Sequence, residues 1–137
     1  MRKINFYKCI SVGIIIILGF VPSISAVQNN SGPDLDVKIL PGPIFPTPTI
    51  KITNRGDDSA HNVKIIDTDV NGKIIYNNRE TNVADVIESD SFKITSVNSW
   101  FFGFGVFNMT VYVSCDEGMF ESDTTNGITI GSLILIP

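Results

Sequence analysis

Apolar and polar residues alternate with a period of two along most of the chain after residue 34, and no helical period of useful length occurs. The longest alternation runs from Val106 to Cys115. Its other positions are polar, except for Val106. Its apolar side is formed by Phe107, Met109, Val111, Val113 and Cys115. This pattern is typical of a strand with one buried face and one wet face.

Shorter alternations, separated by turn residues, predict the remaining strands. They lie at residues 35–40, 49–54, 62–66, 73–76, 83–87, 92–97, 119–123 and 127–136. The Asn71-Gly72 pair predicts a two-residue hairpin between two of them. The alternation stops in the apolar run 133–136, so we expect a last strand that is buried on both faces.

Proline content and chain length limit the architecture. Four prolines between residues 41 and 48 exclude a central strand there and predict an extended segment at an edge. The 137 residues allow one ordinary domain. About seven short strands within about 100 residues predict an all-β fold, an immunoglobulin-like antiparallel β-sandwich, over residues 34–137. Residues 27–33 are expected to form a disordered lead to this domain.

The N-terminal segment differs in kind from the rest of the chain. Three basic residues within the first eight precede an apolar run over residues 10–21, and small residues follow up to Ala26. These parts predict a secretory signal peptide over residues 1–26. The alternative is an uncleaved anchor, although the run is shorter than the ~20 residues of a membrane helix. We therefore expect a secreted or extracytoplasmic protein, at the cell surface or free of it, whose contact with a membrane would need an uncleaved N-terminal segment.

Removal of this segment would make the chain more acidic. The formal net charge of the whole chain is -4, with 10 basic and 14 acidic residues. Without the three N-terminal basic residues, 7 remain against 14, so the domain carries about −7. Because it has no cluster of Lys and Arg, we do not expect it to bind nucleic acid.

Cysteine usage gives a second constraint on the fold. Cys9 lies next to the N-terminal apolar run, so Cys115 is alone after cleavage. The domain would then have no internal disulfide and would be held together by packing. The place of Cys115 in an alternating strand predicts a buried thiol, with pairing between two chains as the alternative.

One segment carries a resemblance to a known family. Residues 50–63, IKITNRGDDSAHNV, resemble the opening of CARDB-type and related immunoglobulin-like domains of bacterial and archaeal cell-surface proteins. Residues 102–105 with the strand that follows, and the glycine-containing segment 127–131, are similar to parts of small secreted sandwich proteins. The family's usual glycine before the fifth strand is absent from residues 88–91. The resemblance implies adhesion, spacing or assembly outside the cell and brings no catalytic residues.

Small residues in these motifs have physical roles of their own. Gly56, in an Asn-x-Gly sequence, is expected to supply the positive φ of a tight turn. Ala60 is expected to permit close approach of two chain segments, and Val63 to begin the next inward face. Gly103 and Gly105 are expected to let a strand bend or bulge.

A partial calcium-binding motif occurs at residues 67–72, which read DTDVNG. It places the oxygen ligands Asp67, Asp69 and Asn71 at the first, third and fifth positions, followed by glycine. The twelfth position is Asn78 instead of the bidentate glutamate, and no helix is predicted on either side. The alternative is a hairpin whose exposed acids keep it soluble. Calcium is the only cofactor that the sequence suggests.

Other candidates for chemistry are weaker. His61 is the only histidine, no Gly-x-Ser-x-Gly sequence occurs, and one His with one Cys is a poor start for a zinc site. The aromatic cluster at residues 100–104 is expected to pack in the core at the end of the sandwich, with an exposed binding patch as the alternative.

The sequence therefore favours a non-catalytic, secreted or cell-surface module for adhesion, protein interaction or envelope structure. Its expected partner is a protein or a glycan at the cell surface. The alternative is a calcium-dependent adhesion or carbohydrate-binding module that uses residues 67–71. A small extracellular hydrolase comes third, because acids are plentiful but a sandwich of this size offers no obvious cleft.

Overall fold

The computed structural model of this chain describes residues 31–44 and 47–137, which form nine strands. The strands are β1 (Leu35–Ile39), β2 (Gly42–Ile44), β3 (Thr49–Asn54), β4 (Ala60–Tyr76), β5 (Thr81–Ile87), β6 (Ser91–Ser96), β7 (Phe101–Ser114), β8 (Phe120–Gly131) and β9 (Leu133–Ile136). The expected signal peptide and residues 27–30 of the expected lead lie outside the described residues.

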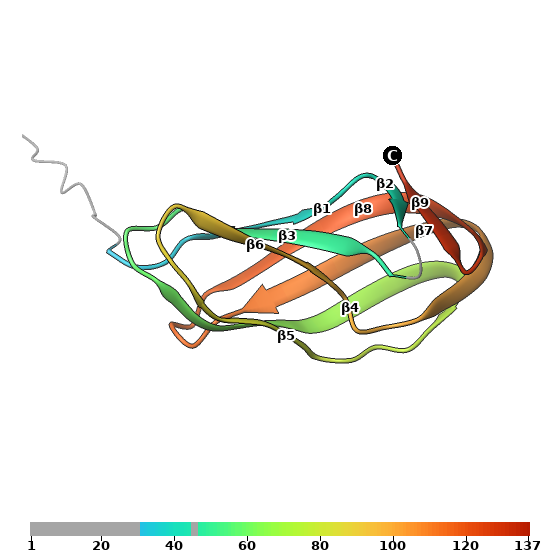
Figure 1. Cartoon of the computed structure of the whole chain (residues 1–137). Helices are drawn as coiled ribbons and strands as arrows, with labels where there is room; N and C mark the ends of the chain where they lie inside the picture. Colours follow the sequence, from blue (N-terminus) through green and yellow to red (C-terminus); the bar gives the residue numbers. More distant parts are fainter. Residues whose placement is uncertain (1–30, 45–46) are drawn as a thin grey trace, which may run out of the picture.

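The strands form two antiparallel sheets (Figure 1). The smaller sheet has the order β1-β3-β6, and the larger sheet has the order β2-β9-β8-β7-β4-β5. Strands β1, β3 and β6 occupy the places of A, B and E in an immunoglobulin fold, and β4, β7 and β8 those of C, F and G. The expected all-β, immunoglobulin-like sandwich is confirmed, with nine strands in the described residues.

The hydrophobic core lies between the two sheets. The alternation predicted for β7 is confirmed, because every second residue from Phe107 to Cys115 is at most 8% exposed. Ala60 and Val63 are fully buried, as their positions predicted. The buried hydrophobic residues come from both sheets and are Leu35, Val37, Ile39, Ile50, Ile52, Ala60, Val63, Ile65, Ile87, Val97, Phe101, Phe107, Met109, Val111, Val113, Cys115, Ile134 and Ile136.

Two predictions about irregular segments are confirmed. The proline-rich stretch contributes β2, which lies at the edge of the larger sheet and pairs with β9. Near Gly103 and Gly105, the register of β7 against β4 shifts, since Gly72 pairs with Phe107 and Ile74 pairs with Gly103. Strand β7 therefore bulges at its glycines.

The chain reverses near Asn71-Gly72, as predicted, but its two arms are not separate strands joined by a two-residue loop. Both residues lie within β4, which continues from Ala60 to Tyr76, and they pair with Asn108 and Phe107 of β7. Strand β4 folds back around these residues, because the Asn78 side chain donates a hydrogen bond to Asp67 and accepts one from the Thr68 backbone N–H, and Thr81 pairs with Ile65. A Cβ at residue 72 would lie 2.9 Å from the carbonyl oxygen of Val106, so glycine permits close approach of β4 and β7 at this bend. Pairing with β7 continues on both sides of this bend, with a register shift between Gly72 and Ile74.

The predicted last strand is present as β9, but its predicted bounds and its burial on both faces are wrong. Residues 119–123 and 127–136 were expected as two strands, but β8 is continuous up to Gly131, where a positive φ of 66° begins the turn to β9. Burial alternates along β9, with Ile134 and Ile136 buried and Leu133 and Leu135 each 36% exposed. The smaller sheet covers only one face of this strand, so the strand is not buried on both faces.

The role predicted for Gly56 needs a different reason. Gly56 is not among the glycines with a positive φ. A Cβ at residue 56 would lie 2.1 Å from the carbonyl oxygen of Gly32, so the glycine permits a close crossing of two backbone segments. The last residues of the expected lead take part in this crossing, and Pro33 is buried.

Candidate interaction surface

The outer face of the larger sheet has a polar half. Side chains that point outward from β4, β7 and β8 lie in cross-strand rows. These rows are Asp67–Tyr112–Ser122, Asp69–Thr110–Thr124 and Asn71–Asn108–Asn126. The last of them is termed the amide row, and in it the Asn108 side chain donates a hydrogen bond to the Asn126 side chain at 3.1 Å.

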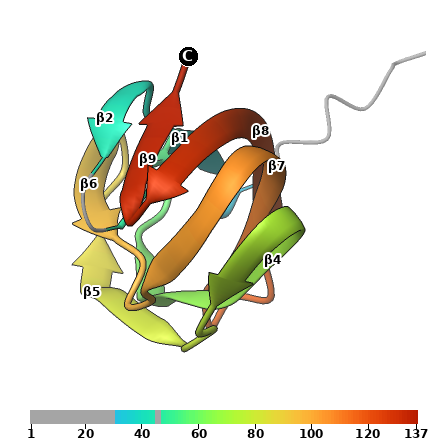
Figure 2. The same cartoon turned by 90° about the vertical axis from the view of Figure 1, so that its right-hand side faces the viewer.

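The other half of this face is apolar. Eight outward side chains, termed the apolar patch, lie on β4, β7, β8 and β9. These four strands are neighbours in the larger sheet (Figure 2). They are Ile75, Phe102, Phe104, Val106, Ile128, Ile130, Leu133 and Leu135. Their exposed fractions range from 36% to 75%, with Val106 the most exposed. Beyond the patch, the amide row begins the polar half.

The aromatic cluster at residues 100–104 supplies part of this patch. Phe101 alone among its aromatic side chains is buried, at 3% exposure, whereas Trp100, Phe102 and Phe104 are 52%, 48% and 62% exposed. The expectation of core packing is therefore wrong for three of the four rings. Phe102 and Phe104 pack edge to face with ring centroids 5.7 Å apart, because alternate residues of β7 share its outer face.

A groove of about 840 Å³ lies where the apolar patch meets the amide row. Patch residues Val106, Ile128 and Leu135 line it together with all three residues of the amide row. None of its lining side chains ionises. The groove can therefore hold an apolar group beside hydrogen-bonding amides, but its side chains supply no acid, base or nucleophile.

The three calcium candidates lie on β4. Asp67, Asp69 and Asn71 occupy alternate outward positions of the strand. Such positions are about 7 Å apart, so the side chains form a line and do not surround one point. Asn78, the twelfth position of the motif, donates a hydrogen bond to the Asp67 carboxylate. Within residues 31–44 and 47–137, no group of three His, Cys, Asp or Glu could hold a metal ion.

Two of these acids share a hollow of about 300 Å³ with aromatic side chains. Asp67 and Asp69 line it together with Tyr76, Tyr112 and Phe120. The rings of Tyr112 and Phe120 are stacked with centroids 5.7 Å apart. Aromatic faces and carboxylates are groups that contact the apolar faces and hydroxyls of a sugar, so this hollow contains the chemistry of the carbohydrate alternative.

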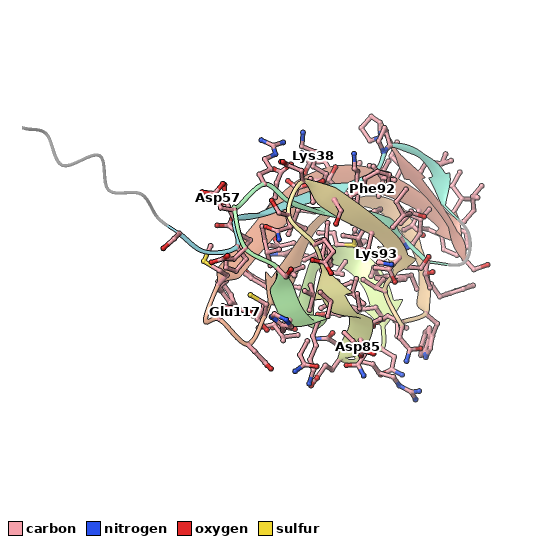
Figure 3. All side chains as sticks on the ribbon, turned by 60° about the vertical axis from the view of Figure 1, so that its left-hand side comes forward. Lys38, Asp57, Asp85, Phe92, Lys93 and Glu117 are labelled. Carbon is pink, nitrogen blue, oxygen red and sulfur yellow. The ribbon has the colours of Figure 1, made fainter. Side chains whose placement is uncertain are left out.

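A second cluster of reactive residue types lies at the opposite end of the sandwich, around Glu117 (Figure 3). The Glu117 carboxylate accepts hydrogen bonds of 3.0 and 3.2 Å from the His61 backbone N–H and lies 2.5 Å from His61 Nδ1. Burial, together with Glu117, raises the pKa of the Cys115 thiol. A nucleophilic cysteine needs the opposite shift. The cluster therefore fastens the start of β4 to the turn after β7 and does not form a nucleophile–base pair.

The Glu117 carboxylate gives a pH-dependent prediction. Burial disfavours its charged form, but hydrogen bonds from His61 and Cys115 outweigh burial and lower the pKa of Glu117 from 4.5 to about 2. A lowered folded-state pKa stabilises the fold above pH 4.5, and this stabilisation is lost as the pH falls from 4.5 to about 2. We therefore expect Glu117→Gln to unfold at a lower temperature than wild type at pH 7, and at the same temperature near pH 2.

Thermal unfolding followed by circular dichroism between pH 2 and pH 7 measures this difference. Glu121→Gln is the matched control, because it removes the same charge from β8 at a distance from His61. The control should show little of the pH-dependent difference. A deficit in Glu117→Gln that stays constant over the whole pH range would contradict the assignment.

Comparison with known proteins leaves the geometry as the main guide. No protein-family model, curated protein or solved structure matches this chain. In the part of the chain that the structure describes, no helix has the length and hydropathy to cross a membrane. The apolar patch is therefore the feature from which a function can be argued.

Proposed function

We propose that this chain is a non-catalytic, exported interaction module that binds the apolar surface of another protein molecule through the apolar patch. The observation that carries the proposal is the gathering of eight exposed apolar side chains on one half of one sheet face. Single exposed apolar residues are ordinary on soluble proteins, whereas a contiguous patch marks an interaction site.

Two further features support this function. The groove beside the patch has no ionisable lining side chain, and the Cys115 thiol is buried with a raised pKa, so neither supports turnover. The basic, apolar and small-residue parts of residues 1–26 support export to a compartment in which adhesion or envelope assembly takes place.

A photo-crosslinking amino acid at Val106 tests the proposal in native cells. Val106 is 75% exposed within the patch, so irradiation is expected to give an adduct of discrete mass. Phe92 is the matched control position. It is 53% exposed on β6 of the smaller sheet (Figure 3), and we expect no adduct there.

The two positions separate a specific interface from general stickiness. Equal adduct yields at Val106 and Phe92 would show that exposure alone determines the reaction. No adduct at Val106 in correctly folded protein would rule out the patch as an interface.

A further inference from the structure

We infer that the occupant of the apolar patch is a second copy of this chain, packed face to face about a two-fold axis. This inference rests on the proposed function and names its partner. Three properties of the outer face of the larger sheet support it: the area of the patch, the positions of an aromatic pair and a groove within it, and the distribution of charge around it.

The area of the patch fits a protein–protein interface. Large apolar side chains expose about 200 Å² each when fully accessible, and those of the patch are about half exposed on average. They present on the order of 800 Å², which is the area that one partner contributes to an interface of standard size. The largest apolar patch of a typical monomer is only about 300–600 Å².

The patch carries an aromatic pair and a groove at matched positions along β7. Side chains that point outward from this strand come in the order Phe102, Phe104, Val106 and Asn108. The edge-to-face pair of Phe102 and Phe104 is at one end of this series, and the groove lined by Val106 and Asn108 is at the other. A two-fold axis perpendicular to the strands, between Phe104 and Val106, places the aromatic pair of each copy over the groove of the other. Such an isologous contact requires both features on one surface, and this face has both.

The charges on the same face determine the orientation of the two copies. No residue of the patch is charged, so two patches can meet without repulsion although each chain has a net charge of -4. The carboxylates of Asp67 and Asp69 lie beyond the amide row, away from the patch. With a two-fold axis perpendicular to the strands, Asp67 and Asp69 of one copy lie beyond the end of the other copy's patch. With an axis along the strands, the acids of the two copies would lie at the same level along the strands and repel each other. The amide row then forms a polar rim of the interface.

Sedimentation velocity of the purified full chain tests this inference. At about 100 µM we expect a mass twice that of one chain. The double variant Phe104→Glu, Ile130→Glu introduces charges at a cross-strand pair in the patch and should weaken dimerisation at least about 100-fold. The matched control is Phe92→Glu, Ile94→Glu, at 53% and 56% exposed positions of the smaller sheet, and it should leave the dimer unchanged.

A measurement on the wild-type chain makes the test independent of these variants. A soluble paramagnetic agent broadens the methyl resonances of exposed isoleucines. As the protein concentration rises, the methyl groups of Ile75, Ile128 and Ile130 should become protected from the agent. Ile94, which is exposed on the other sheet, should stay as accessible as before.

Several results would overturn the inference. They are a wild-type chain that remains monomeric at about 100 µM, a dimer that survives both glutamates, or a dimer that the control pair dissociates. A monomer that binds lipid vesicles would replace the second copy with a membrane. If the crosslinker at Val106 captures a different protein while the purified chain is monomeric, the second copy is wrong but the proposed function stands. If no adduct forms at Val106, the proposed function itself fails.

Discussion

We expect the Asn54→Leu variant to lose about 3–5 kcal/mol of its free energy of unfolding. Asn54 is fully buried, and its amide nitrogen donates to the carbonyl oxygens of Asp58 and Ile87 at 2.7 and 3.0 Å. Its side-chain oxygen accepts from the backbone N–H groups of Asp34 and Gly56, both at 3.0 Å. Leucine fills the space but leaves these four backbone groups without their partner, at about 1–3 kcal/mol for each one that stays buried. Urea unfolding at pH 7 measures the loss.

Two further variants separate hydrogen bonding from packing at this position. Asn54→Asp has nearly the same shape but cannot donate when ionised, so it should destabilise the protein at least as strongly as leucine at neutral pH. Asn82→Ala removes an exposed amide from β5 and should change the stability by no more than about 0.5 kcal/mol. If Asn54→Leu were as stable as Asn82→Ala, the four hydrogen bonds would contribute nothing.

The sequence indicated that the Asn-x-Gly segment matters, but it could not reveal why. Local reasoning treats Gly56 as a turn residue with a positive φ. Its actual contact is with Gly32, and the partners of Asn54 include Asp34 and Ile87, which are 20 and 33 residues away along the chain. Hydrogen bonds over such separations leave no periodic signal, so they become visible only when the strands are placed together.

A similar limit applies to β4. The alternation correctly predicted which residues of β7 are buried, because the period of a strand is a local property. The chain turns near Asn71 and Gly72, but the pairing of both arms with β7 joins them into one strand, and the sequence pattern contains no sign of this pairing. The place of Asp67 and Asp69 on a strand follows from the same pairing.

The apolar patch could be predicted only in part. The alternation places Val106 on the same side as Asn108, and this is correct. Residues 100–104 and 133–136, however, were assigned to buried positions, because the composition of an interface is like that of a core. The order of strands in a sheet decides whether Phe104, Ile130 and Leu133 meet on an uncovered face. No single segment contains that information.

The close crossing at Gly56 gives the second large expected effect. Gly56→Ala should destabilise the protein by about 2–3 kcal/mol, because an inserted methyl group has no free space there. Its Cβ would lie 2.1 Å from Gly32 O, 2.5 Å from Asp34 N and 2.7 Å from Pro33 C. These are backbone atoms, so no side-chain rotation relieves the clash. The segment must move away, which breaks the 2.7 Å hydrogen bond from Arg55 N to Asp34 O.

Gly32→Ala is the matched control, because Gly32 lies on the other side of the same contact. A Cβ at residue 32 meets nothing within 4 Å, and Gly32 is not among the glycines with a positive φ. Both substitutions reduce the conformational freedom of the unfolded chain to a similar extent, so this effect cancels between them. If only Gly56→Ala lowers the free energy of unfolding, and hydrogen exchange at the Arg55 amide becomes faster, the cause is the clash between the added Cβ and the backbone of residues 32–34. Equal free energies of unfolding in the two variants would show that residues 32–34 can move away without loss of stability and are not fixed against the sandwich.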